Sequence, residues 1–435
     1  MANLISDVDT IVIVVMENRS FDHILGYLDL PPYNRKVDGI QAARGLRYAN
    51  SYNGRSYSPS EMSKIEMPHD PPHEREWIAK QLGGRDGDRW SMDGFIQSYY
   101  MNGDVPGPEG DSTPEVMGYH TPGQIPVTDF FARNFAICDR WFSSIPAPSQ
   151  SNRLMAMSGY TLIDSNTYVL PDQYLVYDWL TDNGIRWRVY NEGIPFFVLM
   201  PRWIPSILDE TFRGFELLAH DIRNESDETF PEVIFVEPTY TDAPHMGIAS
   251  DDHSPTPISN GQNFLRKIYL ALTSNPERWA RTVLIITYDE HGGFFDHCSP
   301  PPIVTPAPEG ADYEPFESAG VRVPALVISP LVAAGAVYSK PLDHTSVLQF
   351  LGDKFFPEEG YSSEVASRVQ TFSGRISEIL SLSVPRRELL LPPGAWSGEH
   401  ANSIAFKKAA AAMTDHDVNA MTNKFPELRG FVKRQ

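Results

Sequence analysis

Residues 283–293 read VLIITYDEHGG, and this stretch decides the fold class that the sequence predicts. Its first half is β-branched and apolar, as in a strand of a parallel sheet that is covered on both faces. Asp289 and Glu290 follow the strand directly. Because ligands of open α/β sheets bind at the carboxyl ends of the strands, these carboxylates are candidate ligands of a metal ion. A charged turn is the alternative interpretation of an isolated Asp-Glu pair.

The segment Ile11–Val15 repeats this pattern near the start of the chain. It reads as a second all-apolar strand, and Glu17 and Asn18 follow it after one residue. A carboxylate and an amide carbonyl are hard oxygen donors suited to a divalent cation, although alone they would indicate a turn or a helix cap. Two strands that each deliver such a pair to one edge of a sheet are a much better signal of a metal site.

The composition is that of a folded globular chain with an acidic surface. The 435 residues carry a formal net charge of −20, which argues against a nucleic-acid partner and against adsorption to strongly anionic membranes. At most transient contact with a membrane surface is expected. Cys138 and Cys298 are the only cysteines, so no disulfide framework is expected, and whether these two pair is left open.

No apolar run reaches transmembrane length, and the first residues do not resemble a secretion signal. As written, the sequence predicts a cytoplasmic protein. A secreted or periplasmic protein whose signal has been removed is the alternative, and the oligomeric state is left open.

Helical and strand-like segments alternate along the chain, as expected for a sheet covered on both faces. One catalytic domain is expected over residues 1–385, with a loop-rich insertion at about 29–129, followed by a tail over 386–435 with one helix near 401–413. Besides the two strands above, the sequence predicts strands at 185–190, 232–237 and 323–328. It predicts helices at 154–158, at 174–183, from 259 or 260 to 274, and at 344–356.

Ser149 lies on a proline-flanked turn, Pro146-Ala147-Pro148, that opens the helix whose start is predicted at 154–158. A serine at this place is suited to act as a nucleophile, because the helix N-terminus favours a nearby anion. The local sequence alone favours a simpler interpretation, in which Ser149 or Ser151 caps the helix.

Four motifs, in this order along the chain, resemble those of the bacterial phospholipase C and acid phosphatase superfamily, which includes the plant non-specific phospholipases C. They are residues 16–22, the turn 138–153, residues 287–297, and the segment 320–326 that leads to His344. The resemblance implies an alkaline-phosphatase-like three-layer α/β/α sandwich with a mostly parallel sheet and long loop insertions over the active site. It also implies a metal-dependent phosphoric ester hydrolase that forms a phosphoserine intermediate at Ser149.

The resemblance further implies which residues form the site. The implied ligands of one divalent metal ion are Glu17, Asn18, Ser149, Asp289 and Glu290. The implied catalytic residues are Ser149, His253, His297 and Asn152, and the implied substrate-binding residues are His120 and Arg153. The ligand set is all oxygen, which favours Ca²⁺, Mg²⁺ or Mn²⁺, although carboxylates also bind Zn²⁺.

Two departures from the superfamily pattern bear on the activity. Ser149 resembles the acid phosphatase branch, and Thr256 stands where many relatives carry a second histidine after His253. A phospholipase C that cleaves phosphatidylcholine-like lipids to diacylglycerol and a phosphorylated headgroup is the favoured interpretation. A broad-specificity acid phosphomonoesterase is the alternative, and a module that only binds phosphorylated ligands is the non-enzymatic alternative.

Overall fold

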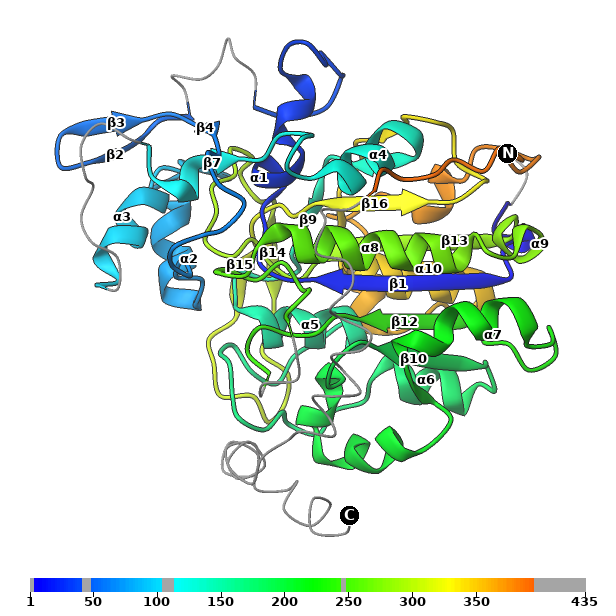
Figure 1. Ribbon diagram of the computed structural model, residues 1–435. Coiled ribbons are helices and arrows are strands. Elements are labelled where there is room, and N and C mark those ends of the chain that lie inside the picture. Colours follow the sequence, from blue (N-terminus) through cyan, green and yellow to red (C-terminus); the bar gives the residue numbers. More distant parts are fainter. Residues whose placement is uncertain (1–3, 41–47, 104–112, 244–247, 395–435) are drawn as a thin grey trace, which may run out of the picture.

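The computed structural model describes residues 4–40, 48–103, 113–243 and 248–394. Its centre is an eight-stranded sheet (Figure 1). In spatial order the strands are β11 (Phe212–Gly214), β10 (Trp187–Asn191), β12 (Val233–Glu237), β1 (Thr10–Met16), β13 (Thr282–Tyr288), β16 (Ala325–Ile328), β8 (Ala136–Cys138) and β17 (Val337–Tyr338). The strands from β11 to β13 are parallel, and β16 is antiparallel to both of its neighbours. The mostly parallel sheet that the sequence predicts is therefore confirmed.

The two central strands are the ones that the sequence marks most clearly. Every residue of β13 is buried, and so is every residue of β1 except Val15, which is half-buried. A strand buried on both faces needs apolar side chains on both faces, which explains the absence of alternation in these two segments. The predicted strand at 323–328 is also present as β16, but it runs against the others.

Helices cover both faces of the sheet (Figure 1). On one face, α5 (Ser149–Ser158) packs against α6 (Val176–Asp182) and α10 (Thr345–Phe355), and these helices meet Ile13 and Val15 of β1. On the other face, α8 (Ile258–Leu272) packs against α4 (Pro126–Asn134) and α7 (Leu218–Asn224). The chain thus forms the expected three-layer α/β/α sandwich.

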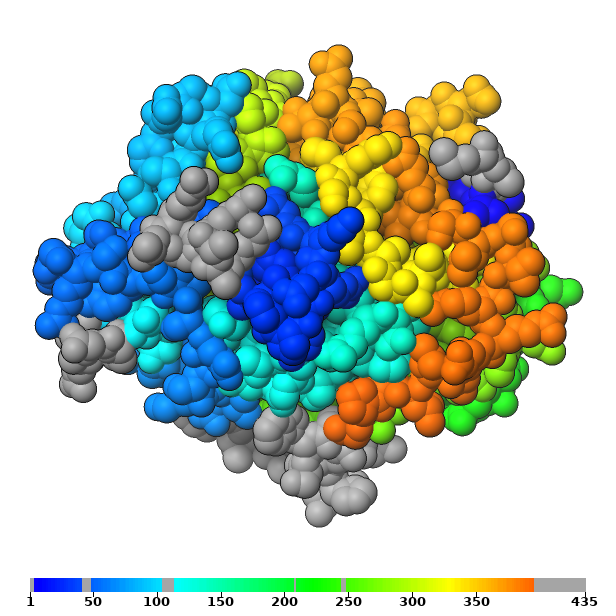
Figure 2. Space-filling view, turned by 90° about the horizontal axis from the view of Figure 1, so that it is seen from above, coloured from blue at the N-terminus to red at the C-terminus, as the bar shows by residue number. Residues whose placement is uncertain are grey.

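The insertion after β1 consists of short elements beside the sandwich. Helices α2 (Arg75–Leu82) and α3 (Phe95–Met101) share a small hydrophobic cluster that includes Phe295. The insertion also contains the strands β2 (Asn50–Tyr52), β3 (Arg55–Tyr57), β4 (Ser60–Glu61), β5 (Arg85–Asp86), β6 (Arg89–Trp90) and β7 (Gly118–Tyr119). In the view from above, the dark-blue segment that follows β1 lies between the lighter-blue insertion and yellow segments of the C-terminal half (Figure 2).

The remaining elements are short connections: α1 (Phe21–Leu25), β9 (Trp141–Phe142), α9 (Pro276–Trp279), β14 (Pro302–Thr305), β15 (Phe316–Ser318), β18 (Leu342–Asp343) and α11 (Ser363–Arg368). Cys138 and Cys298 are buried free thiols. None of the helices in the described ranges combines the length and the hydrophobicity needed to cross a bilayer. The helix predicted near 401–413 lies outside the described residues.

Candidate active site

The pairing of β1 with β13 brings the two predicted ligand pairs together. Met16 is the register partner of Tyr288, so the residues that follow them leave the sheet side by side. The amide of Asp289 donates to the carbonyl of Met16 (3.0 Å), and the amide of Asn18 donates to Oδ1 of Asp289 (3.1 Å). Strand register alone thus places Glu17 and Asn18 beside Asp289 and Glu290.

A close approach of two backbone segments constrains the conformations of Asn18 and Gly292. Asn18 has φ of 59°, in the left-handed region that asparagine tolerates better than most residues. Gly292 has φ of 60°, and a Cβ at this position would lie 2.3 Å from the carbonyl oxygen of Asn18. The glycine after the Asp-Glu-His sequence is therefore required both by its own φ and by this close approach.

Ser149 is the first residue of α5, and it does not cap that helix. The N-cap position is occupied by Pro148, and no side-chain hydrogen bond caps the helix there. Instead, Oγ of Ser149 donates to Oδ1 of Asn18 at 3.1 Å. The interpretation of Ser149 or Ser151 as the helix cap is therefore wrong, and the serine hydroxyl is directed at the residues that follow β1.

Asn152 holds the turn that presents Ser149. Its Oδ1 accepts from the amide of Ile145 (3.2 Å), and its Nδ2 donates to the carbonyls of Ile145 (3.1 Å) and Ala147 (2.6 Å). The side chain is fully buried, and these backbone contacts occupy its amide. The structure gives Asn152 a positioning contact, and its predicted catalytic role rests on the resemblance alone.

Arg153 lies one helical turn after Ser149 and joins two of the predicted ligands. Its Nη2 is 3.0 Å from Oε1 of Glu17, and its Nε is 3.3 Å from Oδ2 of Asp289. Nη1 donates to the hydroxyl of Tyr240 at 3.2 Å. Burial alone would raise the pKa of Glu17, but Arg153 and His253 lower it below its usual value. Arg153 therefore keeps Glu17 ionised and holds it next to Asp289.

His253 and His73 form a histidine pair beside Glu17 and Asn18. Nδ1 of His253 lies 3.2 Å from Oε2 of Glu17, and its Nε2 lies 3.1 Å from Oδ2 of Asp70. Burial alone would lower the pKa of His253, but Asp70 and Glu17 raise it well above its usual value. Nε2 of His73 lies 3.4 Å from Nδ2 of Asn18, and the two imidazole rings are 5.6 Å apart. His253 is thus held as a cation next to a second imidazole.

Two buried carboxylate oxygens of the site lack a hydrogen-bond partner in the described ranges. Oδ2 of Asp289 and Oε1 of Glu290 are buried and have no hydrogen-bond partner within the described part of the chain. Burial and the charge of Glu17 raise the pKa of Asp289 to about 7, although Arg153 opposes them. Oδ2 of Asp289 faces the guanidinium of Arg153 at 3.3 Å without a hydrogen bond, and Oε1 of Glu290 has no hydrogen-bond donor among the described residues. Buried carboxylate oxygens of this kind fit a divalent metal ion.

The described residues also contain three groups of three potential ligands for a metal ion. Two of them share His253, one with Asp70 and His73 and one with Glu17 and Asp251. The third group is Asp22, Asp296 and His297.

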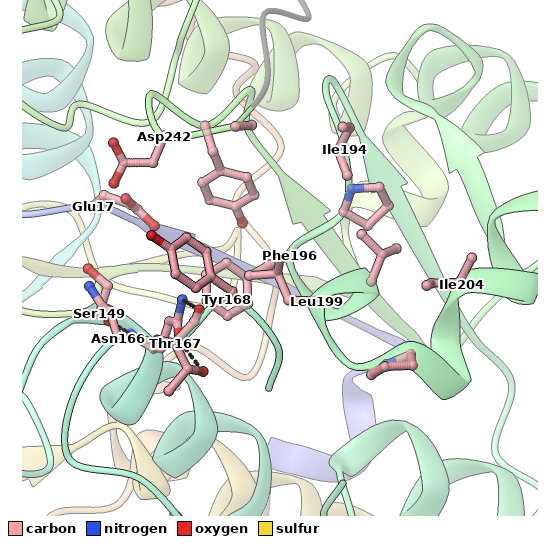
Figure 3. A pocket seen from close by; sticks show the side chains of 16 residues that line it. Glu17, Ser149, Asn166, Thr167, Tyr168, Ile194, Phe196, Leu199, Ile204 and Asp242 are labelled. Atoms are coloured by element: carbon pink, nitrogen blue, oxygen red, sulfur yellow. Dashed lines mark hydrogen bonds between the residues drawn. The ribbon is translucent and has the colours of Figure 1, made fainter. Parts of the chain in front are cut away.

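A cavity of about 540 Å³ opens at Ser149. Ser149 and Glu17 lie at one end of it, with the carboxylate of Asp242 nearby, and Ile194, Leu199 and Ile204 lie toward the other end (Figure 3). The remaining lining residues are Gln150, Asn166, Thr167, Tyr168, Pro195, Phe196, Val198, Pro201, Tyr240 and Ala243. The cavity therefore combines a polar end at the serine with a long apolar wall.

His297 belongs to a separate buried network. Its Nδ1 is 2.7 Å from Asp22 and its Nε2 is 3.1 Å from Asp38. Arg322 in the same network is fully buried and lies 2.9 Å from Asp22 and 3.1 Å from Asp296. Burial alone would lower the pKa of His297, but Asp22 and Asp38 raise it to about 11. These contacts support a structural role, and the predicted catalytic role of His297 rests on the resemblance alone.

His120 packs against His23 of α1. Its Nδ1 lies 3.2 Å from Gln124, and its ring meets the edge of His23 at a centroid distance of 4.6 Å. The predicted substrate-binding role of His120 rests on the resemblance alone.

Comparison with known proteins adds the evolutionary relationship. The sequence profile of the Phosphoesterase family matches residues 8–356. The chain belongs to the Phosphoesterase family. It is 33% identical to the non-specific phospholipase C6 of Arabidopsis thaliana over 353 residues, which cover 77% of this chain and 64% of the plant protein. It is 27% identical to the hemolytic phospholipase C of Pseudomonas aeruginosa, over 81% of this chain and 53% of that one.

This member of the Phosphoesterase family thus spans about two thirds of the plant relative and about half of the bacterial one. Among solved structures, a protein in the alkaline phosphatase superfamily from Vibrio parahaemolyticus is similar at a TM-score of 0.34 and 10% sequence identity. The similarity covers 55% of this chain and 62% of that one.

Sequence reasoning missed Asp70 and His73 in this family member. Both lie in the loop-rich insertion. No local pattern distinguishes His73, because its contacts with Asn18 and His253 bridge segments that are distant in the chain. Thr256 does stand in place of a second histidine after His253, and His73 supplies an imidazole at the site from elsewhere in the sequence.

The buried His120 predicts a defined dependence of the free energy of unfolding on pH. Burial and Arg19 lower its pKa to about 3. Below pH 6.5 the unfolded chain binds a proton at His120 that the folded chain does not, so stability falls as the pH falls toward 3. His120→Gln should make this dependence shallower by about 1.4 kcal/mol per pH unit between pH 6 and 4.

Urea unfolding at several pH values measures this slope. His220→Gln is the matched control, because the side chain of His220 is 67% exposed, and the variant should keep the slope of the original protein. An unchanged slope in His120→Gln would contradict the prediction.

Proposed function

We propose that this chain is a metal-dependent phospholipase C that cleaves phosphatidylcholine-like lipids to diacylglycerol and a phosphorylated headgroup. The observation that carries the proposal is the cavity in which Ser149 and Glu17 lie at one end of an apolar wall. A soluble phosphomonoester would occupy only the polar end of the cavity, whereas the acyl chains of a lipid would also contact the apolar wall. The names of the plant and bacterial relatives support the same activity.

The metal ion would be held by the oxygens of Glu17, Asn18, Asp289, Glu290 and Ser149. When bound, a divalent cation supplies positive charge beside the phosphoryl group and makes the serine hydroxyl more acidic. Support comes from the buried carboxylate oxygens that lack hydrogen-bond partners in the described residues. All of these ligands are oxygens, which Ca²⁺, Mg²⁺ and Mn²⁺ prefer and Zn²⁺ accepts.

The chemistry of the chain itself is a two-step displacement at Ser149. In the first step Ser149 loses its hydroxyl proton to water and Oγ bonds to phosphorus, while the bond from phosphorus to the glycerol oxygen breaks. His253 protonates the departing oxygen, a role that suits an imidazole kept charged by Asp70 and Glu17. In the second step water attacks phosphorus and gives a proton to His253, the bond from phosphorus to Oγ breaks, Oγ takes a proton back from the solvent, and the phosphorylated headgroup leaves.

The same arrangement assigns supporting roles to three residues. Arg153 fixes Glu17 and Asp289, so we infer that it positions the ligands more than it binds substrate. Asn152 fixes the turn before α5. His73 lies next to Asn18 and His253 and would replace the second histidine of many relatives.

We also propose that residues 1–385 form one catalytic domain whose insertion, about 29–129, closes over the site. Asp70 and His73 support this assignment, because both come from the insertion and both contact residues of the sandwich.

Hydrolysis of phosphatidylcholine and of p-nitrophenyl phosphate, measured side by side, tests the proposed substrate. We expect diacylglycerol release at a kcat/KM well above that of phosphate release from the monoester. The reverse ratio would favour the broad phosphomonoesterase, for which the serine at position 149 is the specific observation. Absence of both activities would contradict an enzymatic function.

Removal of the metal should be visible in stability as well as in activity. Chelation should lower the melting temperature by about 3 °C, since a ligand at 100 times its Kd stabilises a protein by about 2.7 kcal/mol. Differential scanning calorimetry with and without chelator measures the shift in melting temperature. Asp289→Asn removes the charge of one proposed metal ligand, so chelator should no longer lower the melting temperature of this variant. A chelator effect of equal size in Asp289→Asn would place the metal elsewhere.

A further inference from the structure

The cavity mouth is bordered by a loop tip that exposes apolar side chains. The tip is residues 166–169, between α5 and α6. Tyr168 lines the cavity and is 74% exposed, and Val169 beside it is 37% exposed. Single exposed apolar residues are common on protein surfaces. What distinguishes this pair is its position, because Tyr168 lies between the serine end and the apolar end of the cavity (Figure 3).

The tip is fastened to the residue that follows the candidate nucleophile. Oε1 of Gln150 accepts from the amide of Thr167 (2.7 Å), and Nε2 of Gln150 donates to the carbonyl of Thr167 (2.9 Å). The amide of Gln150 in turn donates to Oδ1 of Asn166 at 3.1 Å. The backbone of Thr167 and the side chain of Asn166 are thus bound to the first turn of α5, which anchors the start of the tip next to Ser149.

The charged residues near the cavity mouth indicate which kind of lipid surface the tip could contact. Arg202 comes directly after Pro201, one of the residues that line the cavity. Its guanidinium is paired with Asp172 (2.6 Å) and Asp178 (2.6 Å). The carboxylate of Asp242 is 77% exposed at the polar end. With a net charge of −20 on the whole chain, this rim suits an uncharged or zwitterionic surface better than an anionic one.

We propose that the tip 166–169 is the part of this protein that contacts a zwitterionic lipid bilayer, with Tyr168 and Val169 entering its interfacial layer. The cavity mouth then faces the lipid, and a single lipid reaches Ser149 along the apolar wall without crossing water. This inference rests on the proposed lipid substrate and deepens it, because it assigns the surface through which the substrate arrives.

Vesicle binding by variants of Val169 tests the proposal. Val169 is used because it is not among the residues that line the cavity. In a Ser149→Ala background, which removes turnover, co-sedimentation with sucrose-loaded phosphatidylcholine vesicles reports binding alone. Val169→Trp should raise the bound fraction and Val169→Asp should lower the partition coefficient at least about fivefold, as expected for a side chain that enters the interface.

Val384 provides the matched control. It is 69% exposed, and it follows a segment bound to Leu331, near the edge where β13 begins and away from Ser149. Val384→Trp and Val384→Asp should leave vesicle binding unchanged. Addition of phosphatidylglycerol to the vesicles should not strengthen binding by any of these proteins.

Three results would overturn the proposal: no sedimentation of the Ser149→Ala protein with phosphatidylcholine vesicles, equal binding by the two Val169 variants, or binding that requires the anionic lipid. These results are separable from failure of the proposed function. If the original protein does not hydrolyse phosphatidylcholine but the Val169 variants still shift vesicle binding, the contact surface stands and the proposed activity fails.

Discussion

Replacement of Ser149 by alanine is expected to lower the rate of phosphoester hydrolysis by roughly 10³-fold or more. The alanine has no oxygen that can bond to phosphorus, and the hydrogen bond to Asn18 is lost with the hydroxyl. Because both steps of the proposed reaction pass through this oxygen, activity toward phosphatidylcholine and toward p-nitrophenyl phosphate should fall together. Initial rates on both substrates, with equal amounts of folded protein, measure the loss.

Ser151→Ala is the matched control for this prediction. Ser151 lies two residues further along α5, is fully buried, and has an Oγ without a hydrogen-bond partner among the described residues. Removal of an unpartnered hydroxyl should change neither the fold nor the rate appreciably. Full activity in Ser149→Ala would refute the nucleophile assignment, and an equal loss in Ser151→Ala would point to a general disturbance of the helix.

Replacement of Arg322 by methionine is expected to lower the free energy of unfolding by about 3–5 kcal/mol. The guanidinium lies between Asp22 and Asp296, and its Nη1 also donates to the carbonyls of Asp38 (2.6 Å) and Asp139 (2.8 Å). Without it, two buried carboxylates remain opposite each other with only His297 to compensate. Urea unfolding followed by circular dichroism measures the difference.

Arg281→Met separates this effect from the loss of an ordinary ion pair. Arg281 also contacts a carboxylate, that of Asp9 at 2.6 Å, but the two side chains are 55% and 53% exposed. A solvent-exposed pair contributes less than about 1 kcal/mol, so this variant should be nearly as stable as the original protein. Similar losses in both variants would contradict the account of the buried network.

The sequence predicted the centre of the fold because parallel strands covered on both faces leave an unambiguous pattern. Ile11–Val15 and Val283–Tyr288 contain the apolar runs that only such strands need, and both are central neighbours in the sheet. The edges of the sheet were less predictable. The reversed direction of β16 depends on the path of the chain after β13, which side-chain periodicity does not encode.

The candidate site also contains residues that the sequence predicts and contacts that it does not. Glu17, Asn18, Asp289 and Glu290 were predictable because strand ends determine where they emerge. The contacts of Arg153, His297 and His73 were not, because each depends on which distant side chain lies opposite. The sequence does not distinguish an arginine that pairs with two carboxylates from one that binds a phosphate.

The neighbouring position of β1 and β13 also determines when during synthesis the site can exist. Asn18 and Asp289 are 271 positions apart in the chain, and no shorter stretch contains both halves of the proposed cation site. A nascent chain that has emerged only as far as β12 holds Glu17, Asn18 and Ser149 but lacks Asp289 and Glu290. The proposed activity therefore begins only after most of the protein has left the ribosome and β13 has paired with β1.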